Sequence, residues 1–140
     1  MPHLLKMLFR KALRRQQSNS FAMKFLVFTD VHEDVKSIRE LVKRAGGEDI
    51  DFTLCAGDFS TWGRGMRFVF KSFDKLGKPF YAIPGNHEQS GTLFDDALKD
   101  YAHCHSLHGK AIKIGEYILL GYGGGGFATE DADFRKIARG

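Results

Sequence analysis

The sequence predicts an α/β fold, and three observations support this class. Apolar runs typical of buried strands alternate with segments in which apolar residues recur at helical spacing. Glycines follow two of the predicted helices, where they would end them. Two apolar runs separated by Gly115-Glu116 predict an antiparallel hairpin further along the chain. Because strands that alternate with helices pair in parallel, the first part of the chain predicts a parallel sheet in the order β-α-β-α-β.

The predicted elements follow one another without a long linker or an internal repeat. The first strand is an almost continuous apolar run, which predicts burial on both faces of the sheet. The helix after it is closed by Gly46-Gly47, and the second helix is ended by Gly77. In chain order we expect a strand at 24–29, a helix at 35–45, a strand at 51–56, a helix at 66–76, a strand at 80–83, a helix at 91–101, a hairpin at 111–120 and a helix at 131–139.

Residues 1–22 are predicted to lie outside the folded domain, which is expected over residues 23–140. Within the first part, residues 4–13 combine apolar and basic side chains at near-helical spacing. This pattern predicts either a basic amphipathic helix or a disordered extension. An amphipathic helix would bring residues 4–13 into peripheral contact with a membrane surface. Alternatively, translation begins at Met23, directly before the first strand.

The composition is that of a soluble globular protein, because 43% of the 140 residues are apolar and can form one core. The formal charge of +4 is unevenly distributed: the residues beyond the early basic segment comprise 15 basic and 17 acidic side chains. This balance argues against nucleic-acid binding, sequence-specific binding included. Two cysteines make no disulfide framework, and Cys55 lies within a predicted buried strand, so a reducing, cytoplasmic setting is expected.

Polar side chains stand directly after each of the three predicted parallel strands. Asp30 and His32 follow the first strand, Asp58 the second, and Asn86 and His87 the third. The carboxyl ends of parallel strands open on one rim of a sheet, so these side chains are expected to converge. Two carboxylates, an imidazole and an amide oxygen suit Mn²⁺, Fe or Zn²⁺. Asp58 would bridge two cations, because its strand is expected in the middle, and His87 would protonate a departing oxygen.

Three motifs, Asp30-Val31-His32, Gly57-Asp58 and Gly85-Asn86-His87-Glu88, resemble the first three motifs of the calcineurin-like metallophosphoesterases in order and placement. The resemblance covers about residues 24–139 and implies a β-sandwich flanked by helices. It implies Asp30 and His32 on a first metal ion, Asp58 as the bridge, Asn86 on a second metal ion, and His87 as the catalytic residue at the leaving group. The implied cofactors are two divalent metal ions, with Mn²⁺ preferred over Fe, Zn²⁺ or Ni²⁺.

The later histidine motifs of that family have no counterpart here, because no histidine follows Leu120. The sequence therefore corresponds to the N-terminal part of the domain and is expected to be truncated. Asp58 and Asn86 alone remain for the second metal ion, which predicts weak binding there or none. The resemblance implies metal-dependent hydrolysis of phosphate mono- or diesters, so the partner is a phosphorylated substrate. The rival prediction is a non-catalytic scaffold or inactive fragment that binds a protein partner through the sheet rim or an exposed apolar face.

The loop after Asp58 supplies two further candidates for substrate binding. Arg64 would act as a phosphate clamp and Trp62 as a stacking face, or both would belong to a solvated loop. Three carboxylates near the motifs are expected to cap helices or orient their neighbours instead of performing chemistry: Glu33, Asp34 and Glu88.

Two other motifs have weaker functional predictions. His103-Cys104-His105-Ser106-Leu107-His108 favours exposed polar residues over an accessory Zn²⁺ site, with Cys104 pointing away from its two histidine neighbours. Residues 121–126 formally match the glycine spacing of a dinucleotide site. They lack the βαβ context that such a site requires, so we expect a glycine-rich turn close to the phosphate site.

Overall fold

The computed structural model describes residues 23–88, 92–124 and 131–139. The predictions for residues 1–22, including the membrane contact of residues 4–13, lie outside these described residues. Among the helices within the described ranges, none has both the length and the apolar character needed to cross a membrane.

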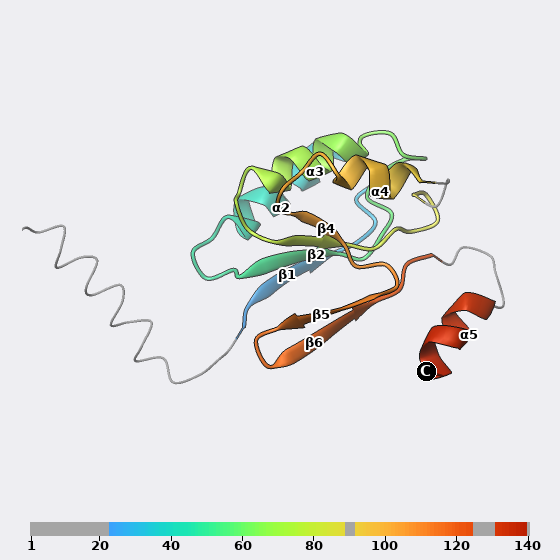
Figure 1. Cartoon of the computed structure of the whole chain (residues 1–140). Helices are drawn as coiled ribbons and strands as arrows, with labels where there is room; N and C mark the ends of the chain where they lie inside the picture. Colours follow the sequence, from blue (N-terminus) through green and yellow to red (C-terminus); the bar gives the residue numbers. More distant parts are fainter. Residues whose placement is uncertain (1–22, 89–91, 125–130, 140) are drawn as a thin grey trace, which may run out of the picture.

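The fold consists of two sheets, a layer of helices on one of them and a further helix, α5, outside this layer, which confirms the α/β class with an added antiparallel hairpin (Figure 1). The first sheet is parallel and has the strand order β1-β2-β3-β4, and the second is the hairpin β5-β6. The strands are β1 (Phe25–Phe28), β2 (Phe52–Cys55), β3 (Phe80–Ala82), β4 (Cys104–Ser106), β5 (Lys110–Ile114) and β6 (Tyr117–Gly121). The helices are α2 (Val35–Ala45), α3 (Met66–Asp74), α4 (Leu93–Leu98) and α5 (Ala132–Arg139).

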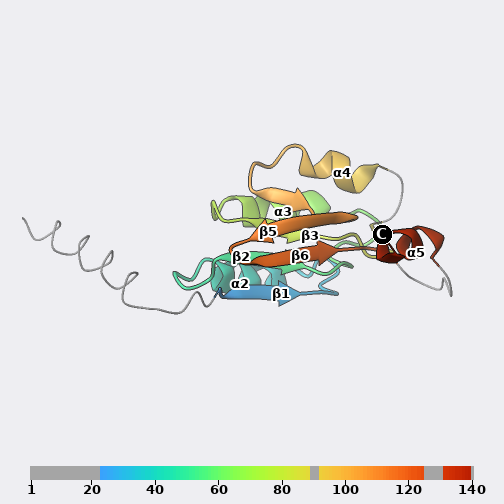
Figure 2. The same cartoon turned by 60° about the horizontal axis from the view of Figure 1, so that its bottom comes forward.

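Helices α2, α3 and α4 lie on one face of the parallel sheet, and the hairpin lies across the other face (Figures 1 and 2). This arrangement follows from the strand order, because right-handed crossovers between successive neighbouring strands place every connecting helix on the same face. The register brings the strand ends level, with Phe28 opposite Cys55 and Cys55 opposite Ala82. The loops that follow β1, β2 and β3 therefore open on one rim, and β2 lies between the other two strands as predicted.

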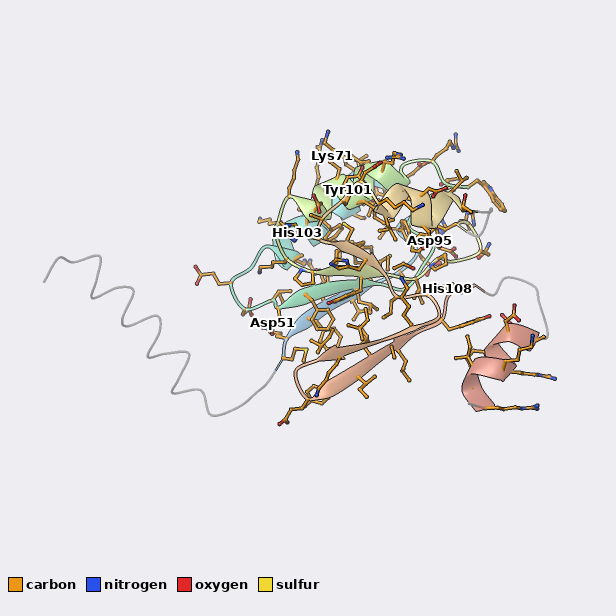
Figure 3. The ribbon with its side chains drawn as sticks, in the orientation of Figure 1. Asp51, Lys71, Asp95, Tyr101, His103 and His108 are labelled. Atoms are coloured by element: carbon orange, nitrogen blue, oxygen red, sulfur yellow. The ribbon has the colours of Figure 1, made fainter. Side chains whose placement is uncertain are left out.

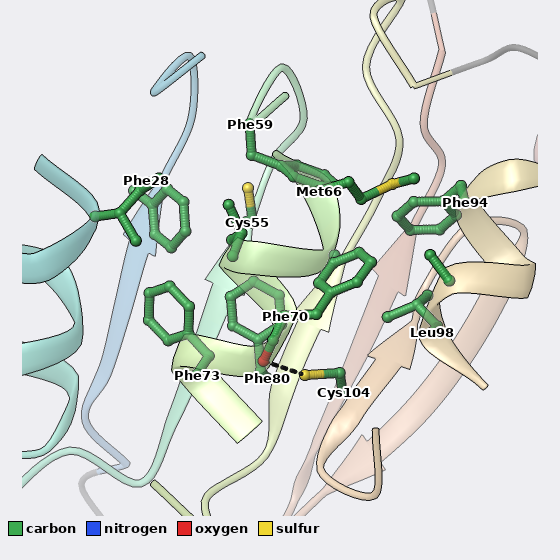
Figure 4. Packing of buried hydrophobic residues seen from close by; sticks show 14 of the residues in the cluster. Phe28, Cys55, Phe59, Met66, Phe70, Phe73, Phe80, Phe94, Leu98 and Cys104 are labelled. Atoms are coloured by element: carbon green, nitrogen blue, oxygen red, sulfur yellow. Dashed lines mark hydrogen bonds between the residues drawn. The ribbon is translucent and has the colours of Figure 1, made fainter. Parts of the chain in front are cut away.

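The core lies between the parallel sheet and the helices and is built largely from phenylalanine rings (Figure 4). Phe73 of α3 stacks on Phe80 of β3 at 4.5 Å between ring centroids and on Phe28 of β1 at 5.4 Å. Phe70, fully buried, adds edge contacts to Phe80. Cys55 is also fully buried, and burial raises the pKa of its thiol, so it behaves as the small buried side chain that the sequence predicts.

Strand β1 differs from the prediction, because it is buried on one face only. Phe28 packs on the helix side and is only 8% exposed, whereas Phe25 and Val27 are 47% and 50% exposed. The expectation of burial on both faces is therefore wrong for this strand. The physical reason is its position: β1 is at the edge of the sheet, and the hairpin leaves a cavity of about 350 Å³ beside Phe25 and Phe52.

The other differences concern short or polar elements. Helix α4 covers Leu93–Leu98, fewer residues than the apolar pattern predicts, and Leu93 is 54% exposed. The sequence does not predict strand β4, because its three residues have no apolar run. It nevertheless pairs in parallel with β3, and Cys104 points into the core while His105 is exposed. Burial raises the pKa of the Cys104 thiol to about 12.

Candidate metal centre

The loops after β1 and β2 remain paired beyond the ends of the strands. The backbone amide of His32 donates to the carbonyl of Asp58 at 3.1 Å, and that of Asp30 donates to the carbonyl of Gly57 at 3.2 Å. The amide of Glu33 donates to the carbonyl of Phe59 at 3.0 Å. The first motif is thus fixed against the second loop by backbone hydrogen bonds that continue the pairing of the sheet.

Three of the predicted metal ligands come together at this rim. Asp30, His32 and Asp58 each offer a ligand atom, and these atoms lie within 4.8 Å of one another. The Nε2 atom of His32 is 3.8 Å from a carboxylate oxygen of Asp30. Among the described residues, no other group of three or more histidine, cysteine or acidic side chains converges in this way.

The backbone of these three residues is strained. Asp30, His32 and Asp58 have φ angles of 56°, 40° and 51°, in the left-handed region, which is uncommon for residues other than glycine although aspartate and histidine adopt it more often than most. Such conformations cost of order 1–3 kcal/mol each and persist where the surrounding structure enforces them, often at functional sites. The strain shows that the fold holds these side chains at the rim against the local preference of the chain.

Glycines allow the second and third loops to touch. A Cβ atom at Gly57 would lie 2.9 Å from the backbone of Gly85, and a Cβ at Gly85 would lie 2.1 Å from Oδ1 of Asp58. The same oxygen accepts a hydrogen bond from the backbone amide of His87 at 3.3 Å. Asn86, half-buried, lies between Gly85 and His87, so the loop that carries it packs directly on Asp58.

Glu88 joins these two loops from below the rim. Its carboxylate is 1% exposed and accepts hydrogen bonds from the amides of Asp58 and Gly85, both at 2.9 Å. It also accepts from the amide of Ser60 at 2.9 Å and from its hydroxyl at 2.6 Å. Glu88 is therefore an orienting residue, as the sequence predicts. Ser60 is not among the sequence candidates, since a serine in a loop carries no signal of a buried partner 28 residues away.

His87 lies between two aromatic neighbours. Its ring centroid is 4.9 Å from that of His32, edge to face, and 4.7 Å from the Trp62 ring. Its Nδ1 atom is buried and has no hydrogen-bond partner within the described part of the chain. An unpaired buried polar atom is uncommon in folded proteins and often marks a functional site.

The remaining sequence candidates lie close to this rim. Trp62 is 68% exposed, and Arg64, also exposed, pairs with Thr61 through an isolated bridge within the same loop. Asp34 accepts a bond from the amide of Ser37 and caps α2, as predicted for these carboxylates. Glu33 lies against Gly65, where an added Cβ would meet its carboxylate at 2.6 Å.

The histidines around β4 do not join the metal ligands. His103 lies before β4 and His108 beyond its other end (Figure 3). His105, His108 and Tyr81 contribute to a cavity of about 750 Å³ that none of the predicted metal ligands lines. Nδ1 of His108 instead accepts a bond from the amide of Gly123 at 2.9 Å.

The glycine-rich segment passes close to the third loop, as expected for its described residues 121–124. The amide of Gly124 donates to the carbonyl of Pro84 at 2.8 Å, and a Cβ at Gly123 would lie 2.3 Å from the same oxygen. Gly125 and Gly126 lie outside the described residues.

The residues at the rim fit a divalent metal ion. Two carboxylates and an imidazole from two strained loops converge within 4.8 Å, and this mixture of oxygen and nitrogen donors suits Mn²⁺, Fe and Zn²⁺. Asp30 and His32 have exposed side chains, so a cation can reach them from solvent. Asn86 would add an amide oxygen from the third loop.

The sequence model of the family described as calcineurin-like phosphoesterase matches residues 23–138. A comparison with curated proteins gives no match. The chain is similar to the crystal structure of TT1561 of Thermus thermophilus, with a TM-score of 0.63 and 16% identity over 71% of this chain and 48% of that one. A second crystal structure has a TM-score of 0.59 and 16% identity over 71% and 52% of the two chains. The chain spans about half the length of these structures, and the likeness shows the fold alone.

Proposed function

Because the chain belongs to the calcineurin-like phosphoesterase family, we propose that it is a metal-dependent phosphoesterase that hydrolyses phosphate mono- or diesters through a dinuclear metal centre. The observation that carries the proposal is the convergence of Asp30, His32 and Asp58 at one rim of the sheet. When bound, divalent cations neutralise phosphate charge and supply a water of lowered pKa as the nucleophile. We assign Mn²⁺ as the preferred ion.

Each side chain at the rim has a separate task in this proposal. Asp30 and His32 would hold the first cation, Asp58 would contribute to both, and Asn86 would hold the second. In the hydrolysis, the attacking water would lose one proton to solvent and its oxygen would form a bond to phosphorus, while the bond from phosphorus to the ester oxygen breaks. His87 gives a proton to that departing oxygen, and its ring is kept in place between Trp62 and His32.

The test compares Asp58→Asn with the unaltered protein. The substitution keeps the shape of the side chain but removes its charge, so Mn²⁺-stimulated hydrolysis of an aryl phosphate is expected to fall at least about 100-fold, in line with loss of a metal-bridging charge. Calorimetry with Mn²⁺ gives a second readout, in which the affinity should also fall. Asp133→Asn is the control, because the Asp133 side chain is 80% exposed on α5.

Two results would count against the proposal. Activity that survives in Asp58→Asn would contradict the role of Asp58. Absence of Mn²⁺ binding to a folded protein would favour the alternative, a non-catalytic scaffold that binds a protein partner.

A further inference from the structure

We propose that Trp62 is a stacking platform that selects phosphate esters with a planar aromatic leaving group. The proposal rests on the proposed function, because it names the substrate class of the same site. Three features carry it: the strained turn that presents Trp62, the contact of its ring with His87, and the exposure of the rest of the ring.

The turn that carries Trp62 is closed by two backbone hydrogen bonds between Thr61 and Arg64, at 3.3 and 3.1 Å. Its two central residues, Trp62 and Gly63, have φ angles of 53° and 80°, as in a type I′ turn. Glycine, asparagine and aspartate suit these positions, whereas a bulky aromatic residue is a conformational outlier there. The first central position thus carries a tryptophan against its backbone preference.

The turn is fixed to the centre beneath it. The amide of Gly63 donates to the hydroxyl of Ser60 at 3.2 Å, and that hydroxyl donates to the buried carboxylate of Glu88. Glu88 in turn accepts a bond from the amide of Asp58. A continuous chain of hydrogen bonds therefore connects the base of the Trp62 turn to the predicted bridging ligand.

The indole ring of Trp62 lies against His87, and the rest of the indole surface is exposed to solvent. The two ring centroids are 4.7 Å apart with an angle of 32° between the planes, yet Trp62 is 68% exposed. Phe59, which lies earlier in the same loop, is fully buried in the core. The loop can therefore bury an aromatic side chain, but Trp62 stays exposed. An exposed tryptophan held beside a histidine at a ligand rim offers a flat apolar face for binding.

The position next to His87 defines what that face would meet. In the proposed reaction, His87 donates its proton to the departing ester oxygen. The group attached to this oxygen would therefore lie next to the Trp62 ring. An aromatic ring attached there would stack on the indole, and an alkyl group would not. Stacking of one aromatic ring on an aromatic side chain changes affinity by roughly ten-fold to a hundred-fold. Arg64, exposed at the base of the same turn, adds positive charge on this side.

The first experiment uses the fluorescence of Trp62, the single tryptophan of the 140-residue chain. With Mn²⁺ present, phenylphosphonate, which cannot be hydrolysed, should quench the emission saturably. Methylphosphonate and inorganic phosphate should not. Adenosine 5′-monophosphate forms a further arm, because ribose separates its aromatic base from the ester oxygen: stronger quenching than by phenylphosphonate would assign a nucleoside, and weaker quenching an aryl group bonded directly to that oxygen. Absence of quenching by both aromatic probes, or equal quenching by methylphosphonate, would overturn the platform.

The second experiment compares hydrolysis of phenyl phosphate and glycerol 2-phosphate. In Trp62→Asn, which suits the turn, the ratio of kcat/KM for the aryl over the alkyl ester should fall about ten-fold through KM. In Trp62→Phe the ratio should stay within about three-fold. Tyr117→Ala is the control, because Tyr117 is an aromatic residue of similar exposure, 63%, on the hairpin.

The two proposals fail in different ways. An unchanged ratio in Trp62→Asn would overturn the platform and leave phosphoesterase activity standing. Failure of the unaltered protein to hydrolyse either ester would contradict the proposed function, and the fluorescence titration would still decide whether Trp62 binds aromatic phosphonates.

Discussion

Individual residues at the rim are held in place by Glu88 more than by their own conformational preferences. Asp58 has a strained φ angle, and its backbone amide is satisfied by Glu88. Ser60 and Gly85 donate to the same carboxylate. One buried carboxylate thus satisfies backbone groups of two loops that follow different strands, which explains how the loops keep a fixed separation.

Replacement of Glu88 by alanine is therefore expected to destabilise the fold. Each buried amide left without an acceptor costs about 1–3 kcal/mol, so the free energy of unfolding should fall by about 3 kcal/mol or more, measured by urea denaturation. Glu88→Gln retains one acceptor oxygen and should fall in between. Glu116→Ala, at the exposed turn of the hairpin, is the control and should stay within about 0.5 kcal/mol. Equal stability of the Glu88 and Glu116 variants would contradict the bridging role.

At the scale of the elements, the close approach of the loops after β2 and β3 depends on Gly85. The distance of 2.1 Å between a Cβ at this position and Oδ1 of Asp58 is far below any normal contact. The φ angle of Gly85 is not in the left-handed region, so the constraint here is steric and does not come from backbone conformation.

The substitution Gly85→Ala is expected to displace the Asp58 side chain and to weaken Mn²⁺ binding at least about ten-fold, as for other changes that disturb the support of a metal ligand. Calorimetry measures the affinity, and circular dichroism checks that the fold persists. Gly46→Ala is the matched control, because a Cβ there would meet its neighbours at ordinary distances of 3.4 Å or more. An unchanged affinity in Gly85→Ala would show that Asp58 does not bind the cation.

For the molecule as a whole, the apolar core lies between the parallel sheet and its helices, and Phe70 is at its centre. The Phe70 ring lies 5.4 to 6.2 Å from those of Phe59, Phe80, Phe94 and Tyr101, which come from separate elements and loops. The other side of the sheet is less completely covered, as the exposure of Phe25 and Val27 shows.

Phe70→Ala should consequently lower the free energy of unfolding by about 3–5 kcal/mol, the usual cost of removing a fully buried aromatic ring. Phe68→Ala is the control on the same helix, where Phe68 is 39% exposed and should cost much less. Thermal or urea unfolding measures both. Similar losses for the two variants would contradict the central position of Phe70 in the core.

The alternation of strands and helices and the three polar motifs at the strand ends can be predicted from the sequence alone. These features follow from local patterns: apolar periodicity selects the element, and parallel pairing brings successive strand ends to one rim. On this basis the convergence of Asp30, His32 and Asp58 could be expected, and the structure brings them within 4.8 Å.

The side chains that complete the rim and the strand faces that are buried depend on contacts between distant parts of the chain. Glu88 meets Asp58 across 30 positions of sequence, and Trp62 meets His87 across the same two loops. Strand β4 is defined by its pairing with β3, since its own residues have no apolar pattern. The physical reason is the same in each case. Burial and hydrogen bonding between distant residues depend on which elements become neighbours, and local sequence patterns do not predict which elements pack together.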